Sequence, residues 1–497
     1  MASTAPETTW HDVARGVALP TEAFIDGAYG PSIDGATFTR TNPATGETLA
    51  TITECTSGDV DRAVSAAARR FASGEWRDAD PSERKRVLLR FAELIREHSA
   101  ELALLETLDT GKPIGQTTTV DAPACAATIQ WYAETLDKLY DEVAPSGKGS
   151  VITIRREPVG VVAAVVPWNF PLIITSWKIG PALAAGNSVI LKPAEESSLA
   201  GIRLGALAAE AGIPAGAFQV VPGRGHVTGE ALGLHDRVDA IAFTGSTEIG
   251  KRFLNYAGDS NMKRVALECG GKSPQIVTRD CADLDGAAEA IAWSIWYNQG
   301  ETCHAGSRLL VDSAVRDVLL QKVQARMATF EPGHPLDPDT VMGAMIGADH
   351  LDRVQGYLDS ARSEGASVHG GDRVEHESGG AYMRPAVITG MTNDMRAARE
   401  EIFGPVLSVI EFDGLDEAIG IANDTHYGLA ASIWTDRISD AHRAAGELRA
   451  GTVWINCYDQ AAVATPFGGY KQSGIGRDRS LHAFDKYTEI KTTWLEL

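Results

Sequence analysis

The alternation of short apolar runs with helical segments between residues 159 and 260 constrains the fold more than any other feature. The runs "GVVAAVVP", "SVILKP", "AFQVVPG" and "VDAIAFTGS" have the length of strands, and helical segments such as "SLAGIRLGALAAEAG" separate them. Parallel strands that helices cover on both faces read as almost continuous apolar runs. The alternation therefore predicts a doubly wound parallel sheet in an α/β fold.

The alternation resumes after residue 271. The predicted strands are "SPQIVT", "SRLLVD", "AVITG", "GPVLSVIEF", "LAASIWT" and "GTVWINC", and the predicted helices cover 284–300 and 313–330. Before residue 159 helical periodicity dominates and predicts helices over 58–74, 81–110 and 120–140. Residues 1–20 lack such a pattern, so we expect little regular structure there. Two α/β units of unequal role follow from this layout.

The bulk composition excludes several classes of protein. The 497-residue chain has a net charge of −21, whereas non-specific nucleic-acid binding needs a basic footprint. Its six cysteines form no C-x-x-C pair and no zinc-like spacing, so we expect reduced thiols in the cytoplasm and no metal site. The most apolar stretch is interrupted by Pro167, Asn169 and Pro171, which argues against a membrane span. The N-terminus does not have the pattern of a signal peptide.

Two stretches are candidates for a nucleotide site. "LKPAEES" places Lys192 and Glu195 at the C-terminal end of a buried strand, the edge where open α/β sheets bind ligands. A carboxylate there can accept both hydroxyls of an adenosine ribose and would repel a 2′-phosphate, which favours NAD over NADP. In "FTGSTEIG", Gly245 and Gly250 do not have the G-x-G-x-x-G spacing, yet a helix N-terminus after a glycine turn suits a phosphate. A solvated strand end and an ordinary strand–helix turn are the alternatives.

Three residues are candidates for catalysis. Glu268 in "VALECGGKSP" ends an apolar strand, where partial desolvation raises the pKa of a carboxylate toward the range of a general base. Asn169 in "PWNFP" carries an amide that can donate to an oxyanion. Cys303 in "NQGETCHAG" is a candidate nucleophile. The alternatives are a carboxylate bonded to backbone N–H groups, a turn-forming asparagine and a buried, inert thiol. His304 is adjacent to Cys303, but neighbouring side chains on a helix or strand do not face each other, so we expect no Cys–His dyad.

The motifs are more specific as an ordered set than any one of them is alone. "PWNFP", "GPALAAGNSVILKPAE", "FTGSTEIG", "LECGGKSP", "NQGETC", "EEIFGPV" and "PFGGYKQSGIGR" together resemble the NAD(P)-dependent aldehyde dehydrogenase superfamily over roughly residues 20–495. The resemblance implies the fold of that family, with a Rossmann-like NAD domain, a catalytic domain and a β-ribbon arm. The implied bounds are 1–20 for an extension, 21–140 and 159–270 for the NAD domain, 271–470 for the catalytic domain, and 141–158 with 471–497 for the arm and C-terminal strand.

The resemblance also implies a mechanism. Cys303 matches the nucleophile that attacks the aldehyde, Asn169 matches the oxyanion donor, and Glu268 matches the base whose water hydrolyses the thioester. The presence of Glu268 favours water over coenzyme A as the acyl acceptor. Lys178 and Asp478 match positions of a proton relay. The implied positions around NAD are Lys192, Glu195, Trp168, Gly225, Ser246, Gly245, Glu401 and Phe403.

The substrate is less well defined by the sequence. "ELALLETLDTGKPI", "AGDSNMKRV", "PGHPLDP" and "YKQSGIGRDRSLHAFDKYTEIKTTW" are most similar to enzymes that oxidise γ-glutamyl-γ-aminobutyraldehyde or ω-aminoaldehydes, so such a substrate is expected. Asp121 would favour a cation, but Ala124 stands in place of a second acidic residue. Ala461 and Ala462 would widen the tunnel, so a broad aliphatic or aromatic specificity is the rival. A thiol hydrolase and a non-catalytic binding protein are the remaining alternatives. The expected tunnel residues are Asp121, Phe170, Ile174, Trp177, Trp293, Tyr297, Thr302, His304, Asp459 and Phe467.

Two segments are candidates for assembly. "GSVITIRREP" at 149–158 and "YTEIKTTWLEL" at 487–497 alternate as strands do and resemble the parts through which the family associates. We therefore expect strand pairing between subunits in a homodimer or homotetramer.

Overall fold

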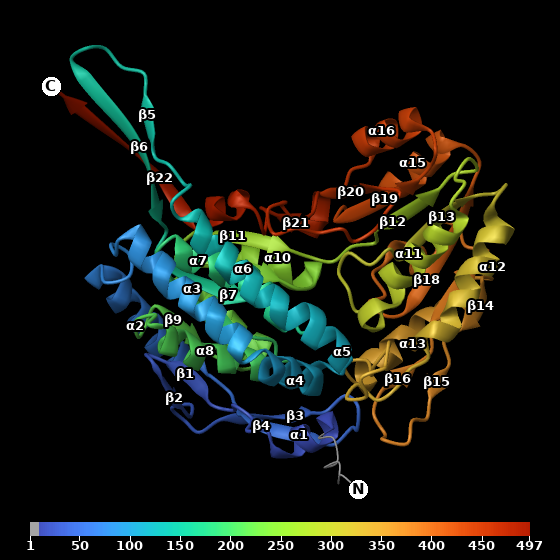
Figure 1. Ribbon diagram of the computed structural model, residues 1–497, viewed down its shortest axis with the longest axis horizontal. Coiled ribbons are helices and arrows are strands. Elements are labelled where there is room, and N and C mark those ends of the chain that lie inside the picture. Colours follow the sequence, from blue (N-terminus) through green and yellow to red (C-terminus); the bar gives the residue numbers. More distant parts are fainter. Residues whose placement is uncertain (1–8) are drawn as a thin grey trace, which may run out of the picture.

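The computed structural model describes residues 9–497 and contains two large sheets, each covered by helices (Figure 1). The first sheet has eight strands in the order β2-β1-β9-β8-β7-β10-β11-β21. Its five central strands are parallel, and an antiparallel strand joins at either side. The strands are β1 (Ala23–Ile25), β2 (Ala28–Gly30), β7 (Val161–Val165), β8 (Ser188–Lys192), β9 (Phe218–Val220), β10 (Ala240–Thr244), β11 (Arg264–Glu268) and β21 (Gly474–Ile475).

Alternate residues of the first sheet face two separate hydrophobic cores. Val162 and Ala164 of β7 pack in the core that includes α3, α4, α6, α7 and α8, whereas Val161 and Ala163 pack with α2 and α10. Helices therefore cover both faces of the first sheet, as its continuous apolar runs predict. The helices are α2 (Ser57–Ser73), α3 (Pro81–Glu97), α4 (Ser99–Thr110), α6 (Ala122–Thr135), α7 (Pro171–Ala184), α8 (Leu199–Ala211), α9 (Glu230–Leu234) and α10 (Thr247–Asp259).

The second sheet has seven strands in the order β14-β17-β18-β13-β12-β19-β20, and only β14 is antiparallel to its neighbour. Helices α11 and α12 cover one face, and α13 to α16 cover the other. The strands are β12 (Pro274–Val277), β13 (Arg308–Asp312), β14 (Ser367–Gly370), β17 (Ala386–Thr389), β18 (Val406–Phe412), β19 (Ala430–Trp434) and β20 (Thr452–Ile455). The helices are α11 (Leu284–Trp296), α12 (Arg316–Arg326), α13 (Ala348–Ser363), α14 (Arg396–Arg399), α15 (Leu415–Asn423) and α16 (Ile438–Glu447).

A third, antiparallel sheet projects from the body as an arm (Figure 1). Its strands are β5 (Glu142–Ala144), β6 (Ser150–Pro158) and β22 (Thr488–Glu496), and β22 pairs with β6 along its whole length. The two segments expected to pair with other subunits are thus strands that pair with each other within one chain. Ile490, Trp494 and Leu495 on β22 are exposed in the single chain.

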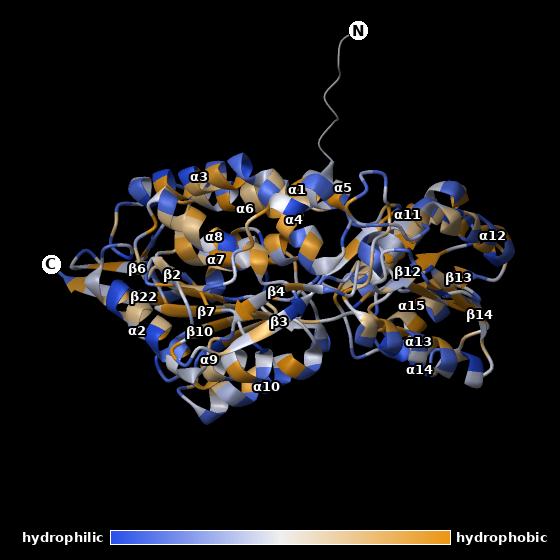
Figure 2. Ribbon diagram, turned by 90° about the horizontal axis from the view of Figure 1, so that it is seen from below, coloured by the Kyte–Doolittle hydropathy of each residue, from blue (hydrophilic) through white to orange (hydrophobic). Residues whose placement is uncertain are grey.

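Small elements complete the chain. Two short hairpins are β3 (Thr37–Thr41) with β4 (Thr48–Thr53), and β15 (Arg373–Val374) with β16 (Tyr382–Met383). Figure 2 shows hydrophobic residues along inner strands such as β7 and β13, and a mixture of both kinds on outer helices such as α3. Among the described residues, no helix has both the length and the apolar character to cross a membrane.

Four local expectations were wrong. The helix expected over 284–300 ends at Trp296, because Asn298 and Gln299 have left-handed backbone angles. Residues 10–16 form α1 (Trp10–Gly16), because Thr9 and Asp12 make a capping box and Trp10 packs on the core. Residues 1–8 lie outside the described part. The helix expected over 81–110 is broken at His98, whose ψ of 17° departs from helical geometry. The helix expected over 120–140 starts with a π-helical turn at Thr117–Asp121 and ends at Thr135; Pro123 has no N–H to donate within that turn.

Candidate active site

Cys303 lies where two cavities meet. The larger cavity measures about 580 Å³, the smaller about 180 Å³, and the half-buried Cys303 lines both. The larger one has mostly aromatic and aliphatic walls. The smaller one is lined by Pro167, Trp168, Asn169, Thr244, Gly245, Ser246, Cys269, Gly270, His350, Arg353, Glu401 and Phe403. A group bound on either side of Cys303 would therefore reach the same sulfur.

A left-handed turn positions the Cys303 loop. Asn298, Gln299 and Gly300 follow α11 with φ values of 48°, 56° and 72°. Asn and Gly tolerate this region better than other residues, and a Cβ on Gly300 would lie 2.2 Å from the Gly404 backbone. The Gln299 side chain accepts a hydrogen bond from Gly343 N at 3.0 Å. The motif "NQG" thus fixes the direction in which the chain enters the cavity.

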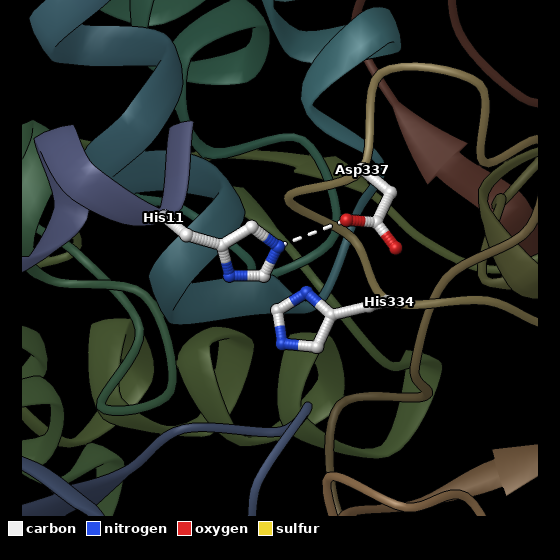
Figure 3. A group of neighbouring side chains, drawn as sticks. All are labelled: His11, His334 and Asp337. Atoms are coloured by element: carbon white, nitrogen blue, oxygen red, sulfur yellow. Dashed lines mark hydrogen bonds and ion pairs between the residues drawn. The ribbon is translucent and has the colours of Figure 1, made fainter. Parts of the chain in front are cut away.

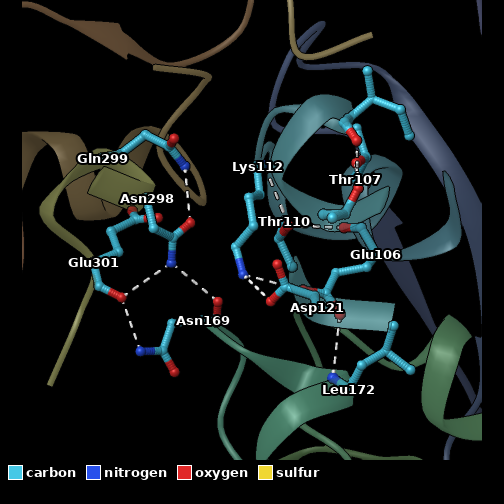
Figure 4. A network of polar contacts seen from close by, with 12 residues as sticks. Glu106, Thr107, Thr110, Lys112, Asp121, Asn169, Leu172, Asn298, Gln299 and Glu301 are labelled. Atoms are coloured by element: carbon cyan, nitrogen blue, oxygen red, sulfur yellow. Dashed lines mark hydrogen bonds and ion pairs between the residues drawn. The ribbon is translucent and has the colours of Figure 1, made fainter. Parts of the chain in front are cut away.

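Residues of the same turn hold Asn169 through hydrogen bonds (Figure 4). Asn169 Nδ2 donates to the Glu301 carbonyl at 2.8 Å, and Asn298 Nδ2 donates to the Asn169 carbonyl at 3.1 Å. A primary amide has two N–H donors, so one N–H of the Asn169 side chain remains for a ligand. Asn169 and Cys303 both line the smaller cavity, which fits the expected role of an oxyanion donor.

Glu268 ends β11 and is buried. The segment that follows it passes close to the Cys303 loop, because a Cβ on Gly271 would lie 2.8 Å from the Cys303 carbonyl oxygen. Burial and the nearby Asp478 carboxylate raise the pKa of Glu268 well above its usual range, against the opposing effect of Lys178. Within residues 9–497, Glu268 Oε2 has no hydrogen-bond partner. A carboxyl group with these properties is suited to act as a general base.

Asp478 connects two buried lysines behind Glu268. Lys178 Nζ lies 2.5 Å from Asp478 Oδ2, and Lys486 Nζ contacts Asp478 Oδ1. Burial tends to raise the pKa of Asp478, but the two lysines lower it overall. The structure therefore brings together Lys178 and Asp478, as expected, and adds Lys486, which sequence reasoning missed. Lys486 lies in the quoted stretch "YKQSGIGRDRSLHAFDKYTEIKTTW", but nothing in that stretch shows that its side chain reaches Asp478.

The smaller cavity has features that fit a nicotinamide and its ribose. Glu401 Oε1 accepts a hydrogen bond from Gly271 N at 3.1 Å, and burial raises the pKa of Glu401 to about 7. A Cβ on Gly270 would lie 1.9 Å from the Glu401 carboxylate, so only glycine permits this approach. Phe403 has a φ of 59°, and its ring meets the Trp168 ring edge-on at 5.2 Å.

The other expected cofactor residues lie at two places: Lys192 and Glu195 are at the end of β8, and Gly245 and Ser246 line the smaller cavity before α10. Lys192 Nζ lies 3.2 Å from Glu195 Oε2, and Gly225 N lies 3.4 Å from Glu195 Oε1. Ser246 is the N-cap of α10, where its hydroxyl accepts from Ile249 N, and the buried Thr244 hydroxyl has no partner among the described residues. A carboxylate, a cation, a free hydroxyl and a helix N-terminus suit the ribose and phosphates of a dinucleotide.

The larger cavity contains eight of the ten expected tunnel residues. They are Phe170, Ile174, Trp177, Trp293, Tyr297, His304, Asp459 and Phe467. The rings of Phe170 and Tyr297 stack at 6.2 Å, and those of Trp177 and Phe467 meet at 5.2 Å. Trp293 is 40% exposed, so it is a wall residue and not part of the helix core.

Asp121 and Thr302 do not line this cavity. Asp121 is fully buried, and its Oδ1 lies 2.7 Å from Lys112 Nζ, which also contacts Glu106 at 3.1 Å (Figure 4). Lys112 Nζ lies 3.9 Å from the centroid of the Phe170 ring, so the ion cluster lies behind that wall. The expected anionic residue of the tunnel is therefore paired with a lysine and does not line the cavity.

His304 and Asp459 correct the expectation that no Cys–His dyad forms. The Cys303 sulfur lies 3.7 Å from His304 Nδ1, and His304 Nε2 lies 2.8 Å from Asp459 Oδ1. Residues 301–307 belong to neither a helix nor a strand, so the alternation of side chains in regular structure does not apply. The two adjacent side chains are free to turn toward the same cavity.

Sequence reasoning missed other residues of the larger cavity, notably Trp454, Tyr458 and Arg479. Arg479 Cζ lies 5.1 Å from the ring centroids of both Trp177 and Phe467. The motif "GIGRDRS" contains this arginine next to Asp478, and that adjacency was the available signal. The charged side chains that line the cavity are thus His304, Asp459 and Arg479.

One group of three side chains could hold a metal ion among the described residues. It contains His11, His334 and Asp337, with His11 Nε2 2.9 Å from Asp337 Oδ1 (Figure 3). The group joins α1 to the loop before α13 and lines neither cavity at Cys303. It therefore belongs to the surface and not to the candidate active site.

Comparisons with known proteins agree on one family. The sequence profile described as the aldehyde dehydrogenase family matches residues 31–493. The chain is 50% identical to the aminoacetaldehyde dehydrogenase of Pseudomonas aeruginosa over 97% of both chains. The structure of a γ-glutamyl-γ-aminobutyraldehyde dehydrogenase from Burkholderia cenocepacia is 54% identical, with a TM-score of 0.96 over 98% of this chain and 99% of that one. The structure of an indole-3-acetaldehyde dehydrogenase with bound NAD+ is 51% identical, with a TM-score of 0.97 over 98% and 99%.

Proposed function

Because the chain belongs to the aldehyde dehydrogenase family, we propose that it oxidises an aldehyde to a carboxylic acid with NAD as the hydride acceptor and Cys303 as the nucleophile. The observation that carries the proposal is the position of Cys303 in the wall shared by two cavities. An aldehyde in the larger cavity and a nicotinamide in the smaller one would meet at the same sulfur. A simple thiol hydrolase has no need of the second cavity.

The residues divide the reaction into two half-reactions. The Cys303 sulfur adds to the aldehyde carbon, and the Asn169 side chain with the Cys303 N–H stabilises the oxyanion. NAD in the smaller cavity would supply the hydride acceptor, so that loss of hydride from this carbon would leave a thioester on Cys303. Glu268 then removes a proton from water, which attacks the thioester and releases the acid. Lys178 and Asp478 carry that proton away from Glu268.

Glu195 supports a preference for NAD over NADP. Its carboxylate is paired with Lys192, and burial and the lysine act on it in opposite directions with a net lowering of its pKa, so it is ionised at neutral pH. An ionised carboxylate can accept both ribose hydroxyls but repels a 2′-phosphate. The solved relative with NAD+ is consistent with this choice.

The charges of the larger cavity support an aldehyde whose nitrogen is acylated. His304 and Arg479 offset Asp459 and the Cys303 thiolate, so the charged side chains give the cavity no excess negative charge. A free ammonium group would find no unpaired counter-charge there, whereas the amide of a γ-glutamylamino aldehyde is uncharged and its methylenes suit aromatic walls. Among the relatives, the γ-glutamyl-γ-aminobutyraldehyde enzyme acts on such a compound. An aromatic aldehyde is the second candidate, because Trp177, Trp293 and Tyr297 offer flat apolar surfaces.

The test is NADH formation from a panel of aldehydes, each with NAD and with NADP. The panel contains γ-glutamyl-γ-aminobutyraldehyde, indole-3-acetaldehyde, benzaldehyde, hexanal, aminoacetaldehyde and 4-aminobutanal. We expect kcat/KM for the uncharged or acylated aldehydes to exceed that for the free amines by about tenfold, equivalent to about 1.4 kcal/mol. A lead for the free amines would contradict the assignment of substrate class. A panel without NADH formation would contradict the function itself.

A further inference from the structure

The His304 imidazole is held between a carboxylate and the candidate nucleophile. Its Nε2 lies 2.8 Å from Asp459 Oδ1, and its Nδ1 lies 3.7 Å from the Cys303 sulfur. The His304 side chain is 14% exposed, and the ring contacts Phe467 edge-on at 5.6 Å. Both ring nitrogens therefore have defined partners, which fixes the orientation of the ring.

The loop after β20 fixes the backbone around His304. Tyr458 Oη donates a hydrogen bond to the His304 carbonyl at 2.6 Å, and Tyr458 packs on Trp454 at 4.6 Å. Asp459 follows Tyr458 with a φ of 57°, an uncommon conformation that directs this loop back to the cavity. The loop after β20 thus holds both the backbone and the side chain of His304.

The groups that face His304 favour its charged form. Burial lowers the pKa of His304, but the charge and hydrogen bond of Asp459 and the Cys303 sulfur raise it to about 10. Asp459 itself is ionised, because His304 and then Arg479 lower its pKa against the effect of burial. Tyr458 contributes its hydroxyl to the backbone and no charge. At neutral pH the imidazole therefore carries a proton on both nitrogens.

We propose that His304 is a further catalytic residue, an imidazolium that pairs with the Cys303 thiolate, and that Asp459 is its positioning residue. The proposal rests on the proposed function in that it explains how the thiolate is available at neutral pH. Cationic neighbours are a known cause of reactive thiolates in proteins, since they favour the charged sulfur. The order of the groups is that of a catalytic triad: a nucleophile, an imidazole ring and a carboxylate that orients the ring.

The step balances without proton transfer from His304. The sulfur lone pair forms the S–C bond to the aldehyde carbon, and the carbonyl π pair moves to the oxygen. When the thioester is hydrolysed, the S–C bond breaks and its electron pair returns to sulfur as the thiolate. His304 keeps both protons throughout, so its contribution is a fixed charge beside the sulfur and not general acid catalysis.

Alkylation of Cys303 by neutral iodoacetamide, without NAD or aldehyde, measures thiolate availability directly. The background carries Cys457→Ser, because Cys457 is the other cysteine that is not buried. In the Cys457→Ser protein with His304 in place, we expect similar alkylation rates at about pH 6 and about pH 8.5. In His304→Gln the rate at about pH 6 falls at least about tenfold relative to that at about pH 8.5, as for an ordinary thiol. Asp459→Asn gives the same change to a smaller extent.

Two further variants make the result specific. His304→Lys restores a cation, so it should recover part of the alkylation rate at about pH 6. This variant also keeps the test valid if His304→Gln folds poorly. His482→Gln is the matched control, because His482 is an exposed histidine that faces a carboxylate, Asp485, at 3.9 Å; it leaves the alkylation profile unchanged. Melting temperatures identify any variant that fails to fold.

The possible outcomes separate this proposal from others. An unchanged alkylation profile in His304→Gln overturns it, and a change in KM alone would then assign His304 to substrate selection. A changed profile together with no NADH formation from any aldehyde would support the ion pair and refute the proposed function. The two hypotheses therefore fail on different measurements.

Discussion

Lys178 Nζ lies 2.5 Å from Asp478 Oδ2, although 300 positions separate the two residues and both side chains are fully buried. Lys486 contacts the other oxygen, so one carboxylate pairs with two buried lysines. Their proximity to Glu268 links the stability of the C-terminal segment to the protonation of the candidate base. Charge removal at Asp478 therefore has consequences for both.

Asp478→Asn is expected to destabilise the protein and to shift its pH–rate profile. The substitution leaves two buried ammonium groups without a counter-charge, which costs about 3–5 kcal/mol. It also removes the carboxylate that raises the pKa of Glu268, so the base ionises at lower pH. We expect a lower Tm and an ascending limb of kcat that moves toward acid pH. Asp485→Asn, which breaks the surface pair with Arg156, is the control and leaves both quantities unchanged. A profile that moves toward alkaline pH would contradict this account.

Glu268→Gln is expected to arrest the enzyme at the thioester. Loss of a general base lowers kcat by about 10²–10⁴-fold, whereas addition of Cys303 to the aldehyde does not need this carboxyl. Intact-mass measurement after mixing with NAD and aldehyde should show the mass of the acylated chain, and one equivalent of NADH should form rapidly. The absence of both an acylated species and a burst would assign Glu268 to a different step.

Asn169→Ala is expected to lower kcat more than it raises KM. The amide contributes to the oxyanion that forms during addition, and loss of one such donor costs about 10²–10³-fold in kcat. The substitution also removes the hydrogen bond from Asn169 to the Glu301 carbonyl, so the Tm should fall slightly. Steady-state kinetics with the best aldehyde of the panel decide the point. A variant with normal kcat and raised KM would show that Asn169 only binds the substrate.

The placement of site residues at strand ends was predictable from the sequence pattern, whereas the contacts between loop side chains were not. Glu268 and Lys192 end buried parallel strands, and the ends of such strands gather at one edge of a sheet. Their positions follow from the strand pattern, and the roles proposed for them come from the family resemblance. The left-handed turn before Cys303 was not predicted, because the helical pattern was extended to residue 300.

His304, Asp459 and Asp121 show where such reasoning fails. His304 and Asp459 are 155 positions apart and lie on irregular segments, where the direction of a side chain follows from tertiary contacts and not from periodicity. Asp121 was expected to give the tunnel a negative charge, but Lys112 pairs with it behind Phe170. The sequence contains each charge, whereas only the fold shows which charges neutralise one another. The expected preference of the tunnel for cations assumed that Asp121 had no such partner.

Glu195→Ser is expected to shift the enzyme toward NADP. The substitution removes the carboxylate that repels a 2′-phosphate and leaves Lys192, which can bind one. The ratio of kcat/KM with NAD to that with NADP should fall by about tenfold or more, which corresponds to about 1.4 kcal/mol. Glu196→Ser is the adjacent control, because the pKa of Glu196 is raised chiefly by burial and it makes no ion pair with Lys192. If both variants keep the original ratio, Glu195 does not face the ribose.

Trp494→Asp is expected to weaken association between copies of the chain. Ile490, Trp494 and Leu495 on β22 are exposed in a single chain, and edge strands with apolar side chains are suited to pair with another chain. We propose that the arm forms the contact of a homodimer or homotetramer. An aspartate in its centre would be buried without a partner, which costs several kcal/mol at each interface. Light scattering after size exclusion should show smaller species than before the substitution. Ile438→Asp, an exposed apolar residue at the start of α16 on the catalytic domain, is the control and should leave the mass unchanged. An equal mass for Trp494→Asp and the unsubstituted protein would place the contact elsewhere.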